Sequence, residues 1–211
     1  MTNGFFITFE GGEGSGKSTQ VKLLSEQLKN RNYKTLLTRE PGGVSSAEVI
    51  RRIIVEGHKD TLLPMSELLL LFAARYEHVE KKIKPAINKG TVVICDRFVD
   101  SSIAYQGYGH GINLKKIYEL SKLTIGNFKP DLTIFLDIPV EEGLSRSKKI
   151  NNEEQRFENM DLSFHKKLHE GFKIIASENS DRFIRVDATQ SIEIIKEEIL
   201  NITLNKISLK K

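Results

Sequence analysis

Short apolar runs alternate with segments of helical periodicity along most of the chain. The apolar runs are rich in β-branched and aromatic residues and stop at glycine, proline or charged residues, which is typical of buried strands. Strands are predicted at residues 5–9, 35–38, 91–95, 132–136 and 183–186. Helices are predicted at residues 18–30, 47–56, 66–89 and 192–204. Apolar strands separated by helices indicate an α/β fold with a parallel sheet covered on both faces.

The pattern predicts one domain over residues 1–211, because no linker, internal repeat or low-complexity segment interrupts it. The chain is long enough for one full-sized core, and two domains would be cramped. Residues 151–155 form a polar interruption inside a helical region, and we interpret them as a loop rather than a domain boundary. A content of 39% hydrophobic and 28% charged residues excludes extensive disorder.

Charge, hydropathy and cysteine content narrow the expected partners and compartment. The formal net charge is only +4 and the charges are dispersed, so no nucleic-acid partner is expected. The apolar run at residues 68–74 is far shorter than the roughly 18–20 residues of a membrane span, and the N-terminus has no features of a signal peptide. A single cysteine, Cys95, cannot form an internal disulfide. We therefore expect a cytoplasmic protein without a membrane partner.

Residues 11–18 match the phosphate-binding motif G-x-x-x-x-G-K-[ST] at every fixed position. A predicted strand ends before the motif and a predicted helix begins after it, which argues against a chance glycine-rich turn. In such a loop, backbone N–H groups face phosphate oxygens, the lysine reaches the β- and γ-phosphates, and the hydroxyl can coordinate Mg²⁺. The predicted ATP-binding residues are Gly11, Gly12, Glu13, Gly14, Ser15, Gly16, Lys17 and Ser18.

Two further features point to phosphoryl transfer. Asp96 follows a buried strand at the edge of the sheet where α/β proteins bind ligands, so Asp96 and Ser18 are the predicted metal ligands. Arginines that suit phosphate oxygens recur in predicted loops. They are Arg39, Arg97, Arg146 and Arg156. A phosphate loop together with several arginines favours transfer to a phosphorylated acceptor over hydrolysis. Any one of these arginines alone is more often a solvated surface charge, and only convergence on the phosphate loop would change that.

Four segments, FITFEGGEGSGKST, TREPGG, ICDRFVDSSIAYQG and PDLTIFLD, resemble thymidylate kinases in sequence and in order. The resemblance runs from Phe6 to about Asp187. It implies a P-loop NTPase-type three-layer fold, with a five-stranded parallel sheet flanked by helices and a short lid at about residues 146–158. It also implies a Mg²⁺-dependent transfer of the γ-phosphate of ATP to dTMP, giving dTDP, by a homodimer packed through helices. Ser15 resembles the bacterial type, in which lid arginines supply charge.

The same resemblance assigns the acceptor site. Glu13 would lie near the 3′-hydroxyl of dTMP, and Tyr105 would occupy the place of a ribose 2′-hydroxyl and so favour the deoxy sugar. Arg39 and Arg97 would bind the phosphate. The remaining residues implied for dTMP binding are Arg51, Phe72, Arg75, Ser102 and Gln106.

The chain departs from the family in two places. The family usually has Phe-x-Ala-x-Arg before the base-binding arginine, whereas here Leu71 takes the aromatic position and Phe72 follows it. Both can share a helix face with Arg75, so packing on thymine is open to either Phe72 or Leu71, and Phe72 is the residue implied for stacking.

The second departure lies in the lid, where Lys148, Lys149 and Ile150 stand at positions that are arginine in some relatives. Arg146 and Arg156 bracket this segment. The predicted catalytic groups are Lys17, Arg97, Arg146 and Arg156. An acceptor phosphate is already anionic, so direct in-line transfer needs no general base.

Two other readings stay open. The nearest is a related kinase for another nucleoside monophosphate or for a deoxynucleoside. A reading from another class is a nucleotide-gated binding protein that does not transfer phosphate, although a switch would not need the arginines and Asp96. His165 and His169 have a metal-ligand spacing, but no third ligand is evident, so a zinc site is not expected.

Overall fold

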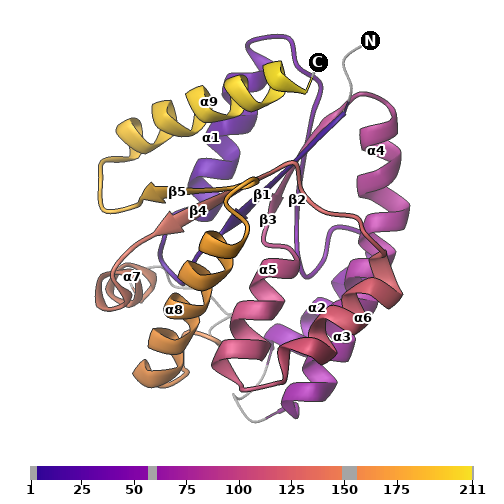
Figure 1. Ribbon diagram of the computed structural model, residues 1–211, viewed down its shortest axis with the longest axis vertical. Coiled ribbons are helices and arrows are strands. Elements are labelled where there is room, and N and C mark those ends of the chain that lie inside the picture. The colour runs from indigo at the N-terminus through magenta and orange to yellow at the C-terminus, as the bar shows by residue number, and fades with distance from the viewer. Residues whose placement is uncertain (1–3, 57–60, 149–155, 211) are drawn as a thin grey trace.

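The computed structural model of the chain describes residues 4–56, 61–148 and 156–210. Its core is one sheet of five parallel strands in the order β2-β3-β1-β4-β5 (Figure 1). The strands are β1 (Phe5–Glu10), β2 (Thr35–Arg39), β3 (Val92–Asp96), β4 (Leu132–Asp137) and β5 (Phe183–Asp187). The five predicted strands and the parallel α/β fold are therefore confirmed.

Helices cover both faces of the sheet. They are α1 (Lys17–Lys29), α2 (Ser45–Val55), α3 (Pro64–His78), α4 (Lys84–Asn88), α5 (Val99–Ser102), α6 (Leu114–Ile125), α7 (Val140–Ser147), α8 (Leu162–Glu178) and α9 (Ile192–Leu209). Two π-helical segments, η1 (Val79–Ile83) and η2 (Ile103–Gly109), continue α3 and α5. In Figure 1, α1 and α9 lie together on one side of the sheet, and α3, α4, α5, α6 and α8 lie on the other.

The alternation of side chains along β1 explains the two covered faces. Phe5, Ile7 and Phe9 pack with residues of α1 and α9, whereas Phe6 packs with η1 and α6 on the opposite face. Successive side chains of a strand point to opposite faces, so both faces of a central strand must be apolar. This explains why the strands read as continuous apolar runs in the sequence.

The carboxyl ends of the strands form a charged edge. Each of the five strands ends with a charged residue: Glu10, Arg39, Asp96, Asp137 and Asp187. In the register, Asp96 lies opposite Arg39 on one side and Phe9 on the other, so the ends of β1, β2 and β3 are level. Parallel sheets bind ligands at this edge, because loops and helix N-termini meet there.

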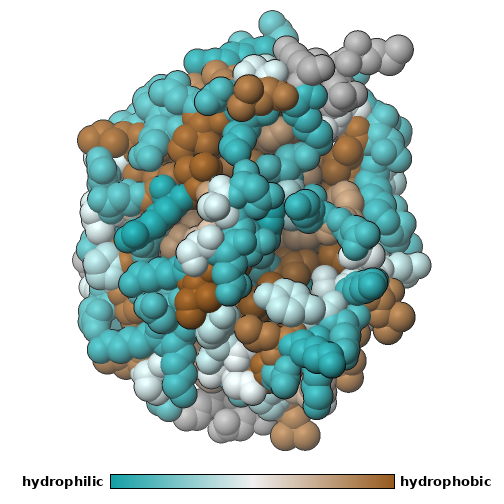
Figure 2. Space-filling view, in the orientation of Figure 1, coloured by the Kyte–Doolittle hydropathy of each residue, from teal (hydrophilic) through white to brown (hydrophobic). Residues whose placement is uncertain are grey.

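The expected helix at residues 66–89 is a series of three segments, α3, η1 and α4. The final helix continues to Leu209, five residues beyond the predicted end. Residues 149–155, which fall within the expected lid at 146–158, lie outside the described residues. Among the described residues, no helix combines the length and the apolar character needed to cross a bilayer. On the face shown in Figure 2, hydrophilic residues are mixed with smaller groups of hydrophobic ones.

Candidate active site

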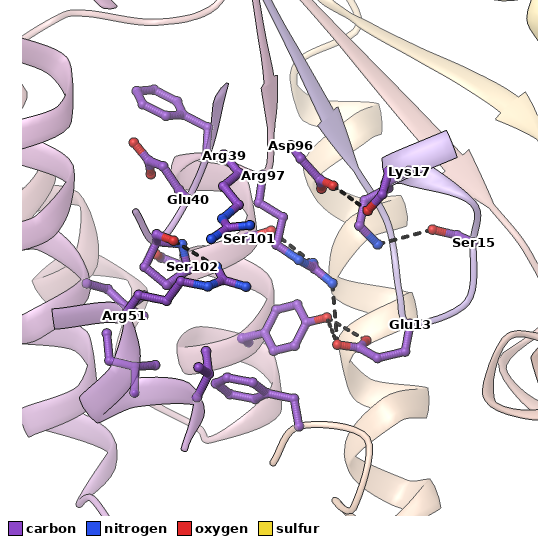
Figure 3. Close-up of a pocket in the computed structure, with 18 of the residues that line it drawn as sticks. Glu13, Ser15, Lys17, Arg39, Glu40, Arg51, Asp96, Arg97, Ser101 and Ser102 are labelled. Carbon is purple, nitrogen blue, oxygen red and sulfur yellow. Dashed lines mark hydrogen bonds and ion pairs between the residues drawn. The ribbon is translucent and has the colours of Figure 1, made fainter. Parts of the chain in front are cut away.

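A cleft of about 600 Å³ opens at the carboxyl edge of the sheet. Its walls come from the phosphate loop, the ends of β2 and β3, helices α2 and α3, and the segment from α5 into η2. Figure 3 shows Arg97 near the centre, with Lys17 and Ser15 to one side and Arg51 and Ser102 to the other. The cleft therefore joins the predicted ATP-binding loop to the predicted acceptor residues.

The phosphate loop is held by close packing against α7. Gly14 has φ +66°, and a Cβ there would lie 1.9 Å from the carbonyl oxygen of Gly143, so only glycine fits. The Nζ of Lys17 donates to the carbonyls of Gly11 (3.0 Å) and Gly12 (2.7 Å). Burial, together with repulsion from Arg97, lowers the pKa of Lys17 to about 8. The Lys17 ammonium group therefore lies inside the phosphate loop, where the loop's own carbonyl oxygens accept its hydrogen bonds.

Ser18 and Asp96 form a pair of oxygen ligands beside the loop. The Ser18 hydroxyl donates to Oδ2 of Asp96 at 2.8 Å. The other carboxylate oxygen, Oδ1, is buried and has no hydrogen-bond partner among the described residues. Hydroxyl and carboxylate oxygens are ligands that Mg²⁺ prefers. This pair fits a Mg²⁺ ion that would complete its coordination with phosphate oxygens and water.

Residues 4–56, 61–148 and 156–210 contain no group of three or more His, Cys, Asp or Glu side chains suited to a metal. His165 and His169, which have a metal-ligand spacing, contact different residues. His169 lies 2.5 Å from Asp137, whereas His165 is buried beside Phe164.

Glu13 is turned away from the loop backbone and contacts two acceptor-side residues. The Tyr105 hydroxyl lies 2.7 and 2.6 Å from the two oxygens of Glu13, and Nη2 of Arg97 lies 3.3 Å from one of them. Burial opposes ionisation of Glu13, but the charges of Arg97 and Lys17 prevail and lower its pKa. Burial raises the pKa of Tyr105 well above its usual range, so its hydroxyl keeps its proton and donates. These contacts explain how a carboxylate is tolerated next to a phosphate site.

Arg97 links the two halves of the cleft. It has φ +69°, which is uncommon for a residue other than glycine, and its Nη1 donates to the carbonyl of Gly11 (3.1 Å) and to Ser101 (3.2 Å). Its guanidinium lies 4.9 Å from the centre of the Tyr105 ring. Strained backbone at a residue with several directed contacts is a recurrent property of functional sites.

Glu10 supports the Arg97 loop and was not identified from the sequence. Its oxygens bond to the backbone N–H of Phe98 (2.8 Å) and to the hydroxyl of Ser101 (2.5 Å). Burial, together with repulsion from Asp100, raises the pKa of Glu10 to about 8. In the sequence, Glu10 is marked only by its position between a strand and the phosphate loop. This position does not reveal that β3 ends next to Glu10 in the folded protein.

Helix α3 contributes two residues to the acceptor half of the cleft, Leu71 and Arg75, which are four positions apart and so share a helix face. Arg75 is buried. Its Nε donates to Glu40 (2.7 Å) and its Nη2 donates to Ser102 (3.0 Å). Its Nη1 is buried and has no hydrogen-bond partner among the described residues. A buried guanidinium with a donor to spare suits a carbonyl oxygen of a bound base.

Phe72 does not line the cleft, where stacking on thymine would require it. Phe72 is fully buried in the core beside α6 and α8, and its ring lies 4.5 Å from the guanidinium carbon of Arg75. Leu71, not Phe72, lines the cleft. The two residues are about 100° apart around the helix, so only one can face the cleft when Leu68 and Phe72 are anchored in the core. Stacking of Phe72 on thymine is therefore not part of this site.

Arg39 and Arg51 both line the cleft. Arg39 forms an exposed ion pair with Glu48 (3.2 Å). Arg51 donates to the carbonyl of Pro41 (2.7 Å), whose peptide bond with Glu40 is cis.

The two arginines that bracket the lid occupy different positions. Arg156 is buried, with Nη1 2.5 Å from Glu67 and 2.9 Å from the carbonyl of Ile54. This differs from an exposed lid cation, because the guanidinium neutralises a buried carboxylate, and we assign it no catalytic role. Arg146 on α7 contacts Glu142 (2.6 Å) and the carbonyl of Ala188 (2.9 Å). Its role in the lid stays a prediction.

Comparisons with known proteins agree with this geometry. A family model for thymidylate kinase matches residues 9–199. The thymidylate kinase of Caulobacter vibrioides is 42% identical over 209 residues, which cover 99% of this chain and 100% of that protein. The thymidylate kinase of Geobacter sulfurreducens is also 42% identical, with 97% and 98% covered. A crystal structure of thymidylate kinase from Ehrlichia chaffeensis superposes with a TM-score of 0.76 at 36% identity, over 95% of this chain and 99% of that one.

Proposed function

This chain belongs to the thymidylate kinase family, and we propose that its cleft holds ATP and dTMP so that their phosphates meet at Arg97. The chain transfers a phosphoryl group from ATP to dTMP, giving dTDP and ADP. The observation that carries the proposed arrangement is the position of Arg97, whose guanidinium contacts the loop carbonyl of Gly11 on the donor side and lies against the ring of Tyr105 on the acceptor side.

On the donor side, residues 11–16 would surround the β- and γ-phosphates with backbone N–H groups. Lys17 would exchange its loop carbonyls for phosphate oxygens, which restores a full positive charge where negative charge accumulates. Ser18 and Asp96 would hold Mg²⁺, directly or through water, and the ion would offset the charge of the triphosphate. The partnerless oxygen of Asp96 supports this assignment.

On the acceptor side, Arg39, Arg51 and Arg97 would bind the phosphate of dTMP from three directions. Glu13 would accept a hydrogen bond from the 3′-hydroxyl, and the ring of Tyr105 would leave no space for a 2′-hydroxyl. The spare Nη1 of Arg75, together with Ser102 and Gln106, would contact the edge of the base, with Leu71 as the apolar wall. These assignments are supported by the lining of one continuous cleft.

Transfer would be direct and in line, without a covalent intermediate. The attacking oxygen belongs to a phosphate that is already anionic, so removal of a proton is not required. Catalysis would come from positioning and from the charges of Lys17 and Arg97, which face the equatorial oxygens of the transferring group.

The activity is tested by following ADP formation from ATP with dTMP, dCMP and thymidine as separate acceptors. We expect dTMP to give the highest specificity constant, and Lys17→Ala to reduce kcat by about 100-fold or more. Higher activity with dCMP or thymidine would overturn the choice of acceptor. Binding of ATP and dTMP without ADP formation would instead support a nucleotide-gated binding protein.

We also propose that the chain acts as a cytoplasmic homodimer. Val49 and Ile53 on α2 and Leu69 and Tyr76 on α3 are about half exposed, and these two helices pack side by side. Apolar residues at helical spacing on neighbouring helices suit contact with a second copy of the chain. Light scattering should give twice the mass of the chain, and Leu69→Glu should give the mass of a monomer. A monomeric wild-type protein at micromolar concentration would contradict the dimer.

A further inference from the structure

The buried carboxylate of Glu67 lies behind the base-binding part of the cleft and has no role in the reaction as described so far. Its side chain is inaccessible to solvent, and it faces the cleft-lining residue Gln106 on one side and Arg156 on the other. Burying a carboxylate is costly, so its retention calls for a physical reason. The proposal below rests on the proposed binding of dTMP.

The contacts of Glu67 determine which atom of each partner faces it. The amide nitrogen of Gln106 donates to Oε1 of Glu67 at 2.7 Å, and Nη1 of Arg156 lies 2.5 Å from Oε2. An ionised carboxylate only accepts hydrogen bonds and a guanidinium only donates. The ion pair with Arg156 keeps Glu67 ionised, so its other oxygen can only accept, and an amide can donate to it only through its nitrogen.

The orientation of the Gln106 amide is therefore fixed. Its oxygen, Oε1, is buried and has no hydrogen-bond partner among the described residues. Gln106 lines the cleft, so this oxygen is the atom left for a bound base. A buried acceptor without a partner is unfavourable in the empty protein and becomes satisfied when a ligand donates to it.

This arrangement matches thymine in particular. Thymine carries an N–H donor at N3, between two carbonyl acceptors, whereas cytosine has a bare acceptor nitrogen at N3. The Oε1 atom of Gln106 would accept from the N3–H of thymine and would repel the N3 lone pair of cytosine. Without a fixed partner the amide could turn over and serve either base, because its oxygen and nitrogen ends are similar in shape.

We propose that Glu67 is a specificity-determining positioning residue, which holds the amide of Gln106 so that its oxygen reads the N3–H donor of the base. Arg156 is part of this arrangement, because its guanidinium forms an ion pair with the second oxygen of Glu67. The ion pair with Glu67 also explains why Arg156, which belongs to the lid region, is buried. Sites built to hydrogen-bond a substrate N–H discriminate strongly against analogues that lack it.

The test compares dTMP with its 3-deaza analogue, in which C–H replaces the N3–H group. In the wild-type protein, the specificity constant for dTMP should exceed that for the analogue by about tenfold or more, as expected for one buried hydrogen bond. Glu67→Gln is similar in size but can donate as well as accept, so it should bring this ratio to within about threefold of unity. Gln106→Ala should do the same, and the double variant should show no further decrease.

Glu48→Gln is the matched control, because Glu48 is a carboxylate near the cleft that contacts Arg39 rather than the amide. This variant should keep the wild-type ratio. Equal loss of activity on both substrates in Glu67→Gln, with the ratio unchanged, would show a structural role only and overturn the proposal. A wild-type ratio near unity would overturn it as well. Absence of phosphorylation of dTMP by the wild-type protein would instead be a failure of the proposed function.

Discussion

Binding of ATP should bring a proton to Lys17. In the free protein the pKa of Lys17 is lowered to about 8 from an ordinary value of 10.5, because burial and the neighbouring Arg97 disfavour its charge. This difference corresponds to about 3 kcal/mol. A triphosphate next to the ammonium group reverses the balance and raises the pKa again. The prediction is tested by measuring ATP binding at different pH values.

The sign and size of the effect follow from these values. Only the protonated form of Lys17 pairs well with phosphate, so affinity should be constant below pH 8 and fall by about tenfold per pH unit above it. At pH 9 about nine-tenths of Lys17 is neutral in the free protein, so ATP binding should take up about 0.9 proton. At pH 7 the uptake from Lys17 should be about 0.1 proton.

Calorimetric titrations in buffers with different ionisation enthalpies measure this uptake directly. Lys17→Arg is the control, because arginine keeps its charge throughout this range and should remove the share that belongs to Lys17. Any uptake left in that variant reports Glu10, whose pKa of about 8 places it in the same window, and Glu10→Gln isolates it. Equal proton uptake at pH 7 and pH 9 in the wild-type protein would refute the reasoning.

Three further predictions concern the metal, the sugar and the fold. Asp96→Asn should raise the Mg²⁺ concentration for half-maximal rate by about tenfold or more, and an unchanged magnesium titration would contradict the assignment. Tyr105→Phe should raise KM for dTMP about tenfold, since Glu13 loses its hydroxyl donor, yet keep the preference for dTMP over its ribose counterpart. Tyr105→Ala should narrow that preference, and an equal ratio in both variants would remove the ring from this role. Arg182→Ala should lower the free energy of unfolding by about 3–5 kcal/mol in urea titrations, because Asp100 loses a bidentate partner, and a loss below about 1 kcal/mol would contradict this.

The sheet and the donor half of the cleft could be predicted from the sequence because local signals specify them. Each strand is a continuous apolar run, and the phosphate loop is a contiguous motif between a strand and a helix. Tyr105 and Arg97 were expected in the acceptor site from resemblance, and the cleft brings them together with Glu13. Contiguous segments of sequence were therefore sufficient for these parts.

The acceptor half depends on packing that periodicity does not determine. Leu71 and Phe72 both fit a face shared with Arg75, and only the anchoring of Phe72 in the core decides between them. The burial of Arg156 follows from Glu67, which lies far away along the chain. Hydrophobic periodicity likewise gives no signal of this ion pair, since both residues read as surface charges in the sequence.

Glu10 was missed for a related reason. Its function depends on the N–H of Phe98 and the hydroxyl of Ser101, which are adjacent only because β1 and β3 are neighbours in the sheet. A strand order of this kind is a property of the whole fold. No local pattern around residue 10 carries that information.

The π-helical segment η2 constrains the length of the chain as well as its side chains. A π-turn contains one residue more than an α-turn, so losing a single residue between Ser102 and Gly111 would restore an α-helix. Every residue after the deletion would then rotate by about 100°, and Tyr105 and Gln106 could not both keep their places. Substitutions in this segment can therefore change substrate preference during evolution, whereas the insertion or deletion of a single residue would disrupt the site.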